Sequence, residues 1–522
     1  MPETTEKSID DLVASLNGKD VMSDWHVLVS YHEDDMNRLL AARHAELEKT
    51  AKVTQVDQFK QPYTDPIRPK EKIDIYYDLK LGTPLMSLID GKAAVVLKFP
   101  ISGTFKVTEA GESTDIPPSL FLKCTTDLKH AQGSLSTGGK TPLLTAEEVV
   151  SFENGPTKES HIVIDLLNPD VLVVDANDEK AVAFDILVRA NLETHIKKFG
   201  IQYHLTTLSA EIKSDASKSQ LIPSKFVMTS VPATGTEKST LIMWIAVQGL
   251  DCAGQPSTTN SPLLFAPGTR KQINPIPKER GASVYIGRDV VYSLFVKPGL
   301  ESKGFTNITA VKSTEELTDG LIVTATPPSN TLTVPQWEPD GSHSKEGSRV
   351  CKSFSFNMNE SSATVRVSRT GSTLTYKHVV KNVEFYKVHY GGASANQVYE
   401  DNREGKADLE LTAESSASWK NEGGDEKLSL CIEAPKSFKS EAHNNNEPNF
   451  FQQYFMGHYK GTLPGMDNMT IPIPEVKIDF GAIDYFLTTN ILLPGSHVFK
   501  PGKASEDIYV PHEILILGSI IG

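Results

Sequence analysis

Residues 24–40 read DWHVLVSYHEDDMNRLL, and within this stretch the pattern of apolar side chains changes its period. Residues 25–31 are aromatic and β-branched, which is typical of a buried strand. A capping-box spacing follows, and apolar residues then recur at helical intervals, at Met36, Leu39 and Leu40. The stretch therefore predicts a short strand that runs directly into an amphipathic helix.

Strand-like patterns dominate much of the rest of the sequence. Residues 73–81 alternate between apolar and polar side chains and end at Gly82, which predicts a half-buried strand. Further strands are predicted at residues 95–107, 162–166, 171–174, 201–205, 226–228 and 241–247 in the first half, and at residues 283–295, 321–324, 364–367, 377–388 and 428–432 in the second half.

A second amphipathic helix is predicted over residues 179–199. Its apolar side chains form one stripe, and Gly200 supplies a C-terminal stop. In the second half of the chain, the aromatic residues 449–459 indicate one further helix. The fold class that we predict is α+β, with highly curved antiparallel sheets wrapped around long amphipathic helices.

Length and composition predict how the chain is divided. The chain has 522 residues, and a domain commonly takes about 100 to 200 residues. We expect a disordered arm at residues 1–20, a β-rich half with two helices at residues 21–275, and a second β-rich half at residues 276–522 that ends in an apolar tail. Polar segments at residues 326–349, 391–427 and 443–447 are predicted to be mobile loops.

Charge and cysteine content argue against several classes of protein. The 52 Lys+Arg and 66 Asp+Glu residues give a net charge of −14, whereas binding to a phosphate backbone needs clustered cations, so we expect no nucleic acid partner. The four cysteines are widely spaced, which predicts neither a disulfide scaffold nor a metal site. The sequence shows no signal-peptide pattern and no transmembrane run, so we expect a cytoplasmic protein at synthesis, with any release by a non-classical route.

Arrangements of residues that carry catalysis are weak in this sequence. His195 and His204 are compatible with a metal pair, although packing or surface histidines are the commoner case. Asp165, Asp175 and Asp185 lie in apolar surroundings, but their regular spacing is typical of turns rather than of a catalytic dyad. We therefore predict no catalytic residue, no metal and no cofactor.

The strongest remaining signal is apolar. A curved sheet rolled around a helix buries its concave face, and an incomplete fit would leave an elongated hydrophobic cavity. A fully packed core is the alternative. The candidate ligand-binding residues lie on the two predicted helices and are Met36, Leu39, Leu40, Phe184, Leu187 and Leu192.

Three parts of the chain resemble a known family. Residues 25–31 (WHVLVSY) and 36–40 (MNRLL) are similar to the opening of the forty-seven-kilodalton proteins encoded in clostridial neurotoxin gene clusters. Residues 487–495 (LTTNILLPG) are similar to the closing segment of that family, and residues 283–300 resemble its central piece.

This resemblance implies the tubular lipid-binding (TULIP) superfamily, in which a curved antiparallel sheet surrounds a long helix and lipid is held by apolar contact. It also implies a role as an accessory to a toxin, which some members fulfil by binding phosphoinositides. The partners implied are a lipid or other apolar ligand and other toxin-cluster proteins. No catalytic residue carries over, because the family has none established.

The function expected is therefore non-enzymatic binding of a lipid or another elongated hydrophobic ligand. The alternative is an interaction subunit of a multi-protein toxin or secretion assembly, in which the apolar tail at residues 508–522 and the polar loops dock partners. A hydrolase with a site built from scattered residues is the third hypothesis.

Overall fold

The computed structural model describes most of the 522 residues. The described residues are 7–50, 54–64, 70, 72–89, 93–132, 144–145, 150–152, 159–166, 171–176, 179–199, 202–210, 221–231, 233, 238–254, 263, 273–311, 320–336, 348–368, 372–390, 398–422, 427–435, 438–443, 460–462, 475–480, 483, 486–487, 491–492, 498–501 and 508–521.

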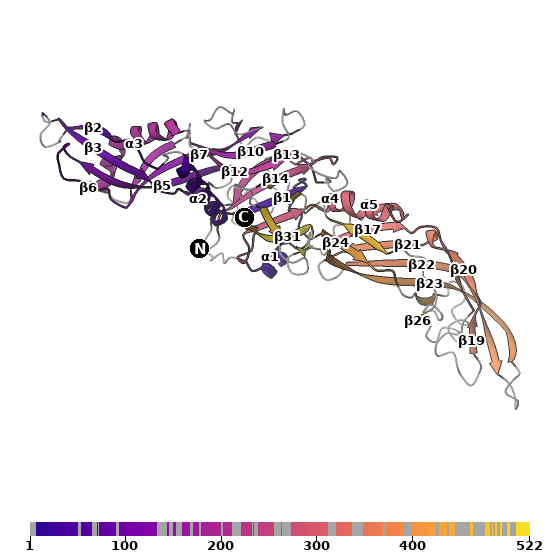
Figure 1. Ribbon diagram of the computed structural model, residues 1–522. Helices are drawn as coiled ribbons and strands as arrows, with labels where there is room; N and C mark the ends of the chain where they lie inside the picture. The colour runs from indigo at the N-terminus through magenta and orange to yellow at the C-terminus, as the bar shows by residue number, and fades with distance from the viewer. Residues whose placement is uncertain are drawn as a thin grey trace. The chain divides into compact units, whose positions relative to one another are not determined.

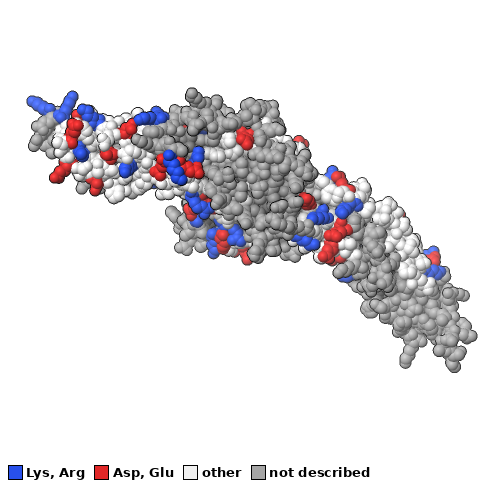
Figure 2. All heavy atoms as spheres, viewed as in Figure 1, with Lys and Arg blue, Asp and Glu red and all other residues white. Residues whose placement is uncertain are grey.

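The chain forms two compact units. Unit 1 comprises Met1–Gly287, Ala482–Ile508 and Ile514–Gly522, and unit 2 comprises Arg288–Gly481 and Tyr509–Glu513. Within the apolar tail, this division assigns Ile514–Gly522 to unit 1 and Tyr509–Glu513 to unit 2. On the face shown in Figure 2, Lys and Arg side chains are intermixed with Asp and Glu on the described parts of both units.

One sheet of unit 1 is built from near-continuous apolar runs. Its strands follow the order β29-β31-β15-β1-β14-β13-β9, and every pair is antiparallel. All six residues of β1 and all eight of β14 are buried, as expected for strands covered on both faces. The bounds are β1 Val27–His32, β9 Val150–Ser151, β13 Pro223–Val231, β14 Thr240–Val247, β15 Ala282–Ile286, β29 Val498–Pro501 and β31 Ile514–Ile521, with β30 Ile508–Tyr509 beside β31.

The apolar tail is a strand of this sheet. β31 pairs with β15, and Leu517 lies opposite Ser283. Four consecutive tail residues, 514–517, are at most 2% exposed. The tail is therefore buried by its own fold.

A second, larger sheet of unit 1 is strongly curled. Its strands follow the order β2-β3-β5-β7-β10-β12-β28, with short strands added beside β5 and β7. The bounds are β2 Phe59–Thr64, β3 Lys72–Leu81, β4 Leu85–Leu88, β5 Ala94–Lys106, β6 Thr114–Asp115, β7 Leu120–Gln132, β8 Leu144–Thr145, β10 Glu159–Asp165, β11 Val171–Ala176, β12 Gln202–Ser209 and β28 Ile491–Leu492. The predicted alternation at residues 73–81 is thus part of β3.

Gly103 shows why a glycine interrupts the apolar pattern of β5. Its φ is +125°, and a Cβ atom placed there would lie 2.1 Å from the carbonyl oxygen of Asp78 on β3. A side chain cannot occupy that space, so the close approach of the two strands requires glycine.

Two long helices lie against these sheets (Figure 1). α2, Glu33–Thr50, packs on β1, β4 and β12, and α3, Glu179–Phe199, packs on β11 and β2. Both helices agree with the sequence prediction. No helix within the described residues is long and apolar enough to span a membrane.

The amino-terminal arm predicted at residues 1–20 needs correction. Residues Ile9–Leu16 form α1, capped by Ser8, whose side chain accepts a hydrogen bond from the backbone N–H of Asp11 at 3.2 Å. Leu12, Val13 and Leu16 are buried. These three side chains lie on one face of the helix and anchor it to the fold, although the surrounding sequence is polar.

Unit 2 is built on one curled antiparallel sheet with the order β16-β17-β21-β22-β23-β24-β27, and a two-stranded sheet of β18 and β20. The bounds are β16 Thr306–Ala310, β17 Leu321–Thr326, β18 Thr331–Val334, β19 Ser348–Cys351, β20 Phe354–Asn357, β21 Ser362–Val367, β22 Ser372–Tyr390, β23 Val398–Glu422, β24 Lys427–Ile432, β25 Lys439–His443, β26 Lys460–Thr462 and β27 Val476–Asp479, with the short helix η3 Met358–Glu360.

The strand predicted at residues 283–295 is wrong in its second part. β15 ends at Ile286, and a continuous helical stretch follows: α4 Arg288–Val290, η2 Val291–Val296 and α5 Lys297–Glu301. The β-branched and aromatic residues there suggested a strand. Val291, Phe295 and Leu300 recur at helical intervals and are buried, so packing overrides local propensity.

The polar segments that were predicted to be loops also need correction. Val398–Glu422 is β23, which pairs with β22 along its length, and Thr331–Val334 is β18. In β23, small and apolar residues alternate with polar ones from Ala407 to Ala413, so one face is buried although the composition is polar. The helix predicted at residues 449–459 lies outside the described residues.

Candidate functional site

The ligand-binding residues predicted from sequence lie on the two long helices of unit 1. Four have described side chains, and none is more than 3% exposed: Met36, Leu39 and Leu40 on α2, and Leu192 on α3. Phe184 and Leu187 belong to α3, but their side chains lie outside the description. Their role as ligand contacts stays a prediction.

The amino-terminal half of α2 is tied to β4 by side chains that pair with backbone groups. Asn37 donates from Nδ2 to the carbonyl oxygen of Met86 at 2.9 Å, and its Oδ1 accepts from the backbone N–H of Met86 at 2.7 Å. Glu33 accepts from the backbone N–H of Leu88 at 3.0 Å. The amide of Asn37 thus replaces a neighbouring strand, and it fixes the helix against the sheet.

Further along α2, one polar pair lies in the apolar interior. The Nδ1 atom of His44 is 2.8 Å from the hydroxyl of Tyr203 on β12, and Phe99 lies beside both rings. His44 is 1% exposed, and burial lowers the pKa of its imidazole and raises the pKa of the Tyr203 phenol. Both groups are therefore neutral near pH 7.

The second nitrogen of His44 has no hydrogen-bond partner. Its Nε2 is buried and unpaired within the described structure, and Glu48, at 3.8 Å from Nε2, is beyond hydrogen-bond distance. An imidazole bonded through Nδ1 keeps one further hydrogen-bonding position. A buried polar atom without a partner is destabilising by about 1–3 kcal/mol, so this atom needs an explanation.

His204, which the sequence analysis weighed against a metal pair with His195, belongs to a polar cluster with His161 and Thr207. The Oγ1 atom of Thr207 lies 2.7 Å from Nδ1 of His161 and 2.7 Å from Nε2 of His204. Burial, followed by the charge of His161, lowers the pKa of His204 to about 4. Thr207 is only 4% exposed, so the hydroxyl bridges two strands and is closed to a substrate.

The three aspartates that lie in apolar stretches of the sequence fall on strands or near them and on helix α3. The carboxylate of Asp165 lies 3.4 Å from Nζ of Lys129 and is largely buried. Asp175 lies on β11 and Asp185 on α3, and their side chains are outside the description. Within the described part of the chain, no three His, Cys, Asp or Glu side chains are placed to hold a metal ion.

An open pocket lies in unit 2, where strands fork. Along one edge of β22, β21 pairs up to Lys377 and β19 pairs from Phe385 onward. β23 pairs along the other edge of β22. Among the described strands, none pairs with this edge of β22 between Lys377 and Phe385. The pocket formed there has a volume of about 520 Å³.

The wall on the β22 side is a bulge. Lys381 and Asn382 together face one residue of β23, Asp408, and Asn382 has a φ of +57°. The carboxylate of Asp408 accepts from the backbone N–H of Asn382 at 3.1 Å and so holds the turned backbone. Bulges of this kind reorient side chains and are frequent beside functional sites.

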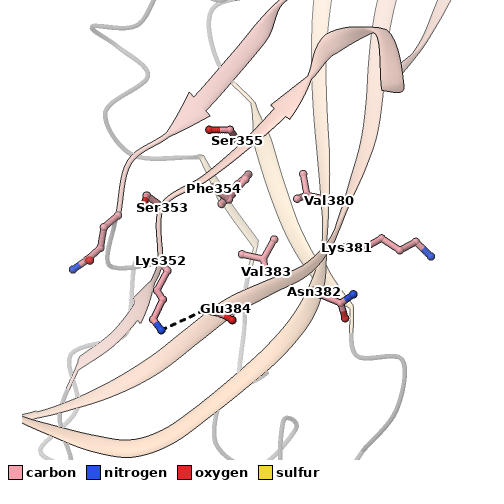
Figure 3. A pocket seen from close by; sticks show the side chains of 10 residues that line it. Lys352, Ser353, Phe354, Ser355, Val380, Lys381, Asn382, Val383 and Glu384 are labelled. Carbon is pink, nitrogen blue, oxygen red and sulfur yellow. Dashed lines mark hydrogen bonds and ion pairs between the residues drawn. The ribbon is translucent and has the colours of Figure 1, made fainter.

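The pocket combines an apolar floor with a polar end (Figure 3). Phe354, Val380 and Val383 point into the same space, whereas the side chain of Lys381 points away. At one end, Lys352 Nζ lies 3.2 Å from Glu384 Oε2.

Sequence reasoning missed this pocket. It treated residues 326–349 as a loop and residues 377–388 as an uninterrupted strand. The one local signal was Lys381-Asn382 between valines, because asparagine tolerates a left-handed backbone better than other side chains. The fork itself depends on strand pairings between distant segments.

Helices laid on strongly curled antiparallel sheets define an α+β protein. No protein-family model matches the chain, and no curated protein matches it. Among solved structures it is similar to P47 of Clostridium botulinum E1, with 9% identity and a TM-score of 0.46, covering 95% of this chain and 99% of that chain.

Two further solved structures are similar. P47 from Clostridium botulinum A2 has 11% identity and a TM-score of 0.46, covering 95% of this chain and 98% of that chain. A lipopolysaccharide binding protein has 9% identity and a TM-score of 0.26, covering 95% of this chain and 99% of that chain. The forty-seven-kilodalton family that the sequence resembles is thus represented among these structures.

Proposed function

We propose that this chain is a non-enzymatic protein that binds a lipid or another elongated apolar ligand in unit 1. The observation that carries the proposal is the unpaired Nε2 of His44, buried where α2 faces β12 and Phe99. An apolar ligand with a carbonyl or carboxyl oxygen would supply the missing partner.

The energetics favour a long hydrocarbon ligand. Burial of apolar surface contributes about 0.8 kcal/mol per CH₂ group, so an acyl chain can bind without a charged contact. Apolar side chains on both helices face the interior of the unit, as Leu40 and Leu192 show. The hydrogen bond to His44 would then fix which end of the ligand lies beside Tyr203.

The test is ligand capture by the full chain. Purified protein is exposed to mixed liposomes, reisolated, extracted with solvent and analysed by mass spectrometry. We expect bound lipid in the wild type and a clear loss in His44→Phe, which keeps an aromatic ring but removes both ring nitrogens, Nε2 and the Nδ1 that pairs with Tyr203. Absence of lipid from the wild type would contradict the proposal.

A matched control comes from unit 2. His378 is also buried, at 7% exposed, and stacks on Phe356 with ring centroids 4.6 Å apart. His378→Phe removes a buried imidazole of the same kind outside the proposed binding region. It should retain lipid, and equal losses in both variants would count against a specific contact at His44.

We further propose that the chain acts as an accessory to a toxin system, with other toxin-cluster proteins as partners. The support is the sequence resemblance at residues 25–31, 36–40 and 487–495. Co-expression with neighbouring gene products, followed by size-exclusion chromatography with light scattering, tests it. Elution of the chain alone under all conditions would argue against such an assembly.

A further inference from the structure

The pocket at the strand fork of unit 2 is separate from the apolar interior of unit 1 in which His44 lies. Its lining residues come from β20, from the residues just before β20, from the bulge of β22 and from Gln336 after β18, all within unit 2. We propose that this pocket binds a neutral saccharide ring. The proposal does not depend on lipid binding by unit 1.

The charges around the pocket favour a neutral ligand over an anion. Glu384 binds two ammonium groups: its Oε2 lies 3.2 Å from Nζ of Lys352, and its Oε1 lies 3.1 Å from Nζ of Lys406. Lys381 lies 3.9 Å from the carboxylate of Asp408. Each of these ammonium groups already faces a carboxylate, so a phosphate would have to displace one.

The floor suits one face of a sugar ring. Phe354 and Val380 are half-buried and Val383 is buried, and Figure 3 shows all three side chains turned toward the same space. The C–H groups on one face of a pyranose form an apolar surface that packs on aromatic and aliphatic side chains. The floor therefore provides apolar contact area for a ligand that carries no charge.

The end of the pocket suits the ring's hydroxyl groups. A hydroxyl both donates and accepts a hydrogen bond, so a pair of adjacent hydroxyls needs a donor and an acceptor side by side. Lys352 and Glu384 present such a pair. Gln336, Ser353 and Ser355 add amide and hydroxyl groups to the lining. The combination of an apolar floor and a donor–acceptor end is typical of a site for an uncharged polyol.

The backbone geometry fixes this arrangement before a ligand binds. The backbone N–H of Lys352 donates to the carbonyl oxygen of Glu384 at 2.9 Å, which holds the two sides of the fork together. Asp408 holds the bulge through Asn382. A preorganised site loses less conformational entropy on binding than a flexible one.

The test is saturation-transfer difference NMR on the full chain with methyl glycosides of glucose, galactose, mannose and N-acetylglucosamine. We expect transfer to at least one glycoside, and binding weakened about tenfold in Glu384→Gln, because hydrogen bonds to a charged acceptor are lost. Phe354→Ala should abolish transfer to the ring protons. No transfer to any glycoside would overturn the proposal.

A matched control lies on the same sheet. Glu410 on β23 pairs with Lys377 at 2.9 Å and does not line the pocket. Glu410→Gln removes a comparable ion pair and should leave glycoside binding unchanged; equal weakening in both variants would overturn the proposal. Inorganic phosphate, followed by ³¹P line broadening, is the anionic probe. Phosphate binding that competes with the glycoside, and that strengthens in Glu384→Gln because the repelling carboxylate is gone, would identify an anion site instead.

Discussion

Replacing His32 should remove one histidine's share of the acid sensitivity of unit 1. His32 ends β1 and is 5% exposed. Burial, reinforced by the positive charge of Lys238 and opposed by Asp34, lowers its pKa from 6.5 to about 4. The unfolded chain therefore binds a proton at this position between pH 6.5 and 4, while the folded chain does not.

The magnitude follows from proton linkage. Stability from the neutral imidazole is fully present above pH 6.5 and is lost as the pH falls toward 4. With these two pKa values, the loss between pH 7 and pH 5 is about 2 kcal/mol, and the full loss in stronger acid is about 3 kcal/mol.

His32→Asn is a suitable perturbation, because the side chain stays polar near Thr240, whose Oγ1 lies 3.4 Å from Nδ1 of His32, but does not titrate. The free energy of unfolding of unit 1 is measured for both proteins by hydrogen exchange of peptides from β1, at pH 5 to 8. The advantage of the wild type over the variant should shrink by about 2 kcal/mol from pH 7 to pH 5 and stay constant above pH 7.5. A difference that does not change with pH would refute the reasoning.

Three further substitutions and one labelling reaction test the fold. Asn37→Ala leaves two backbone groups of Met86 without partners and should lower the free energy of unfolding by about 2 kcal/mol in urea denaturation. Gly103→Ala should lower the free energy of unfolding by more than about 3 kcal/mol in the same assay, because the new Cβ would meet the backbone of β3. Its control is Gly249→Ala, where φ is +79° but the space is open, and the loss in free energy of unfolding should be about 1 kcal/mol. Cys124, whose pKa burial raises to about 12, should resist iodoacetamide at pH 8 until the chain unfolds, as read by peptide mass spectrometry.

Two parts of the fold that the sequence predicted well have a more buried and a more exposed face. Residues 73–81 alternate at period two and lie within β3, and residues 179–199 repeat at helical intervals and form α3. In both, the local pattern directly records which side faces the interior. The β-branched run at residues 289–296 misled because burial on a helix can use the same residues as burial on a strand.

In the candidate sites, too, local spacing predicted some residues, whereas contacts between distant segments could not be predicted. Met36, Leu39 and Leu40 could be placed on a buried helical face from their spacing alone. The partner of His44 could not, because Tyr203 is 159 residues away in sequence. The pocket at the fork was also beyond local reasoning, since it lies on the part of the β22 edge with which neither β19 nor β21 pairs.

The pairing of β31 with β15 has a consequence for synthesis. The ribosome adds 514 − 286 = 228 residues between the end of β15 and the start of β31. At about 5–20 residues per second, translation leaves that edge of β15 without its final neighbour for roughly 10 to 50 seconds. Until β31 is made, that edge of an apolar strand is a template on which another chain can pair.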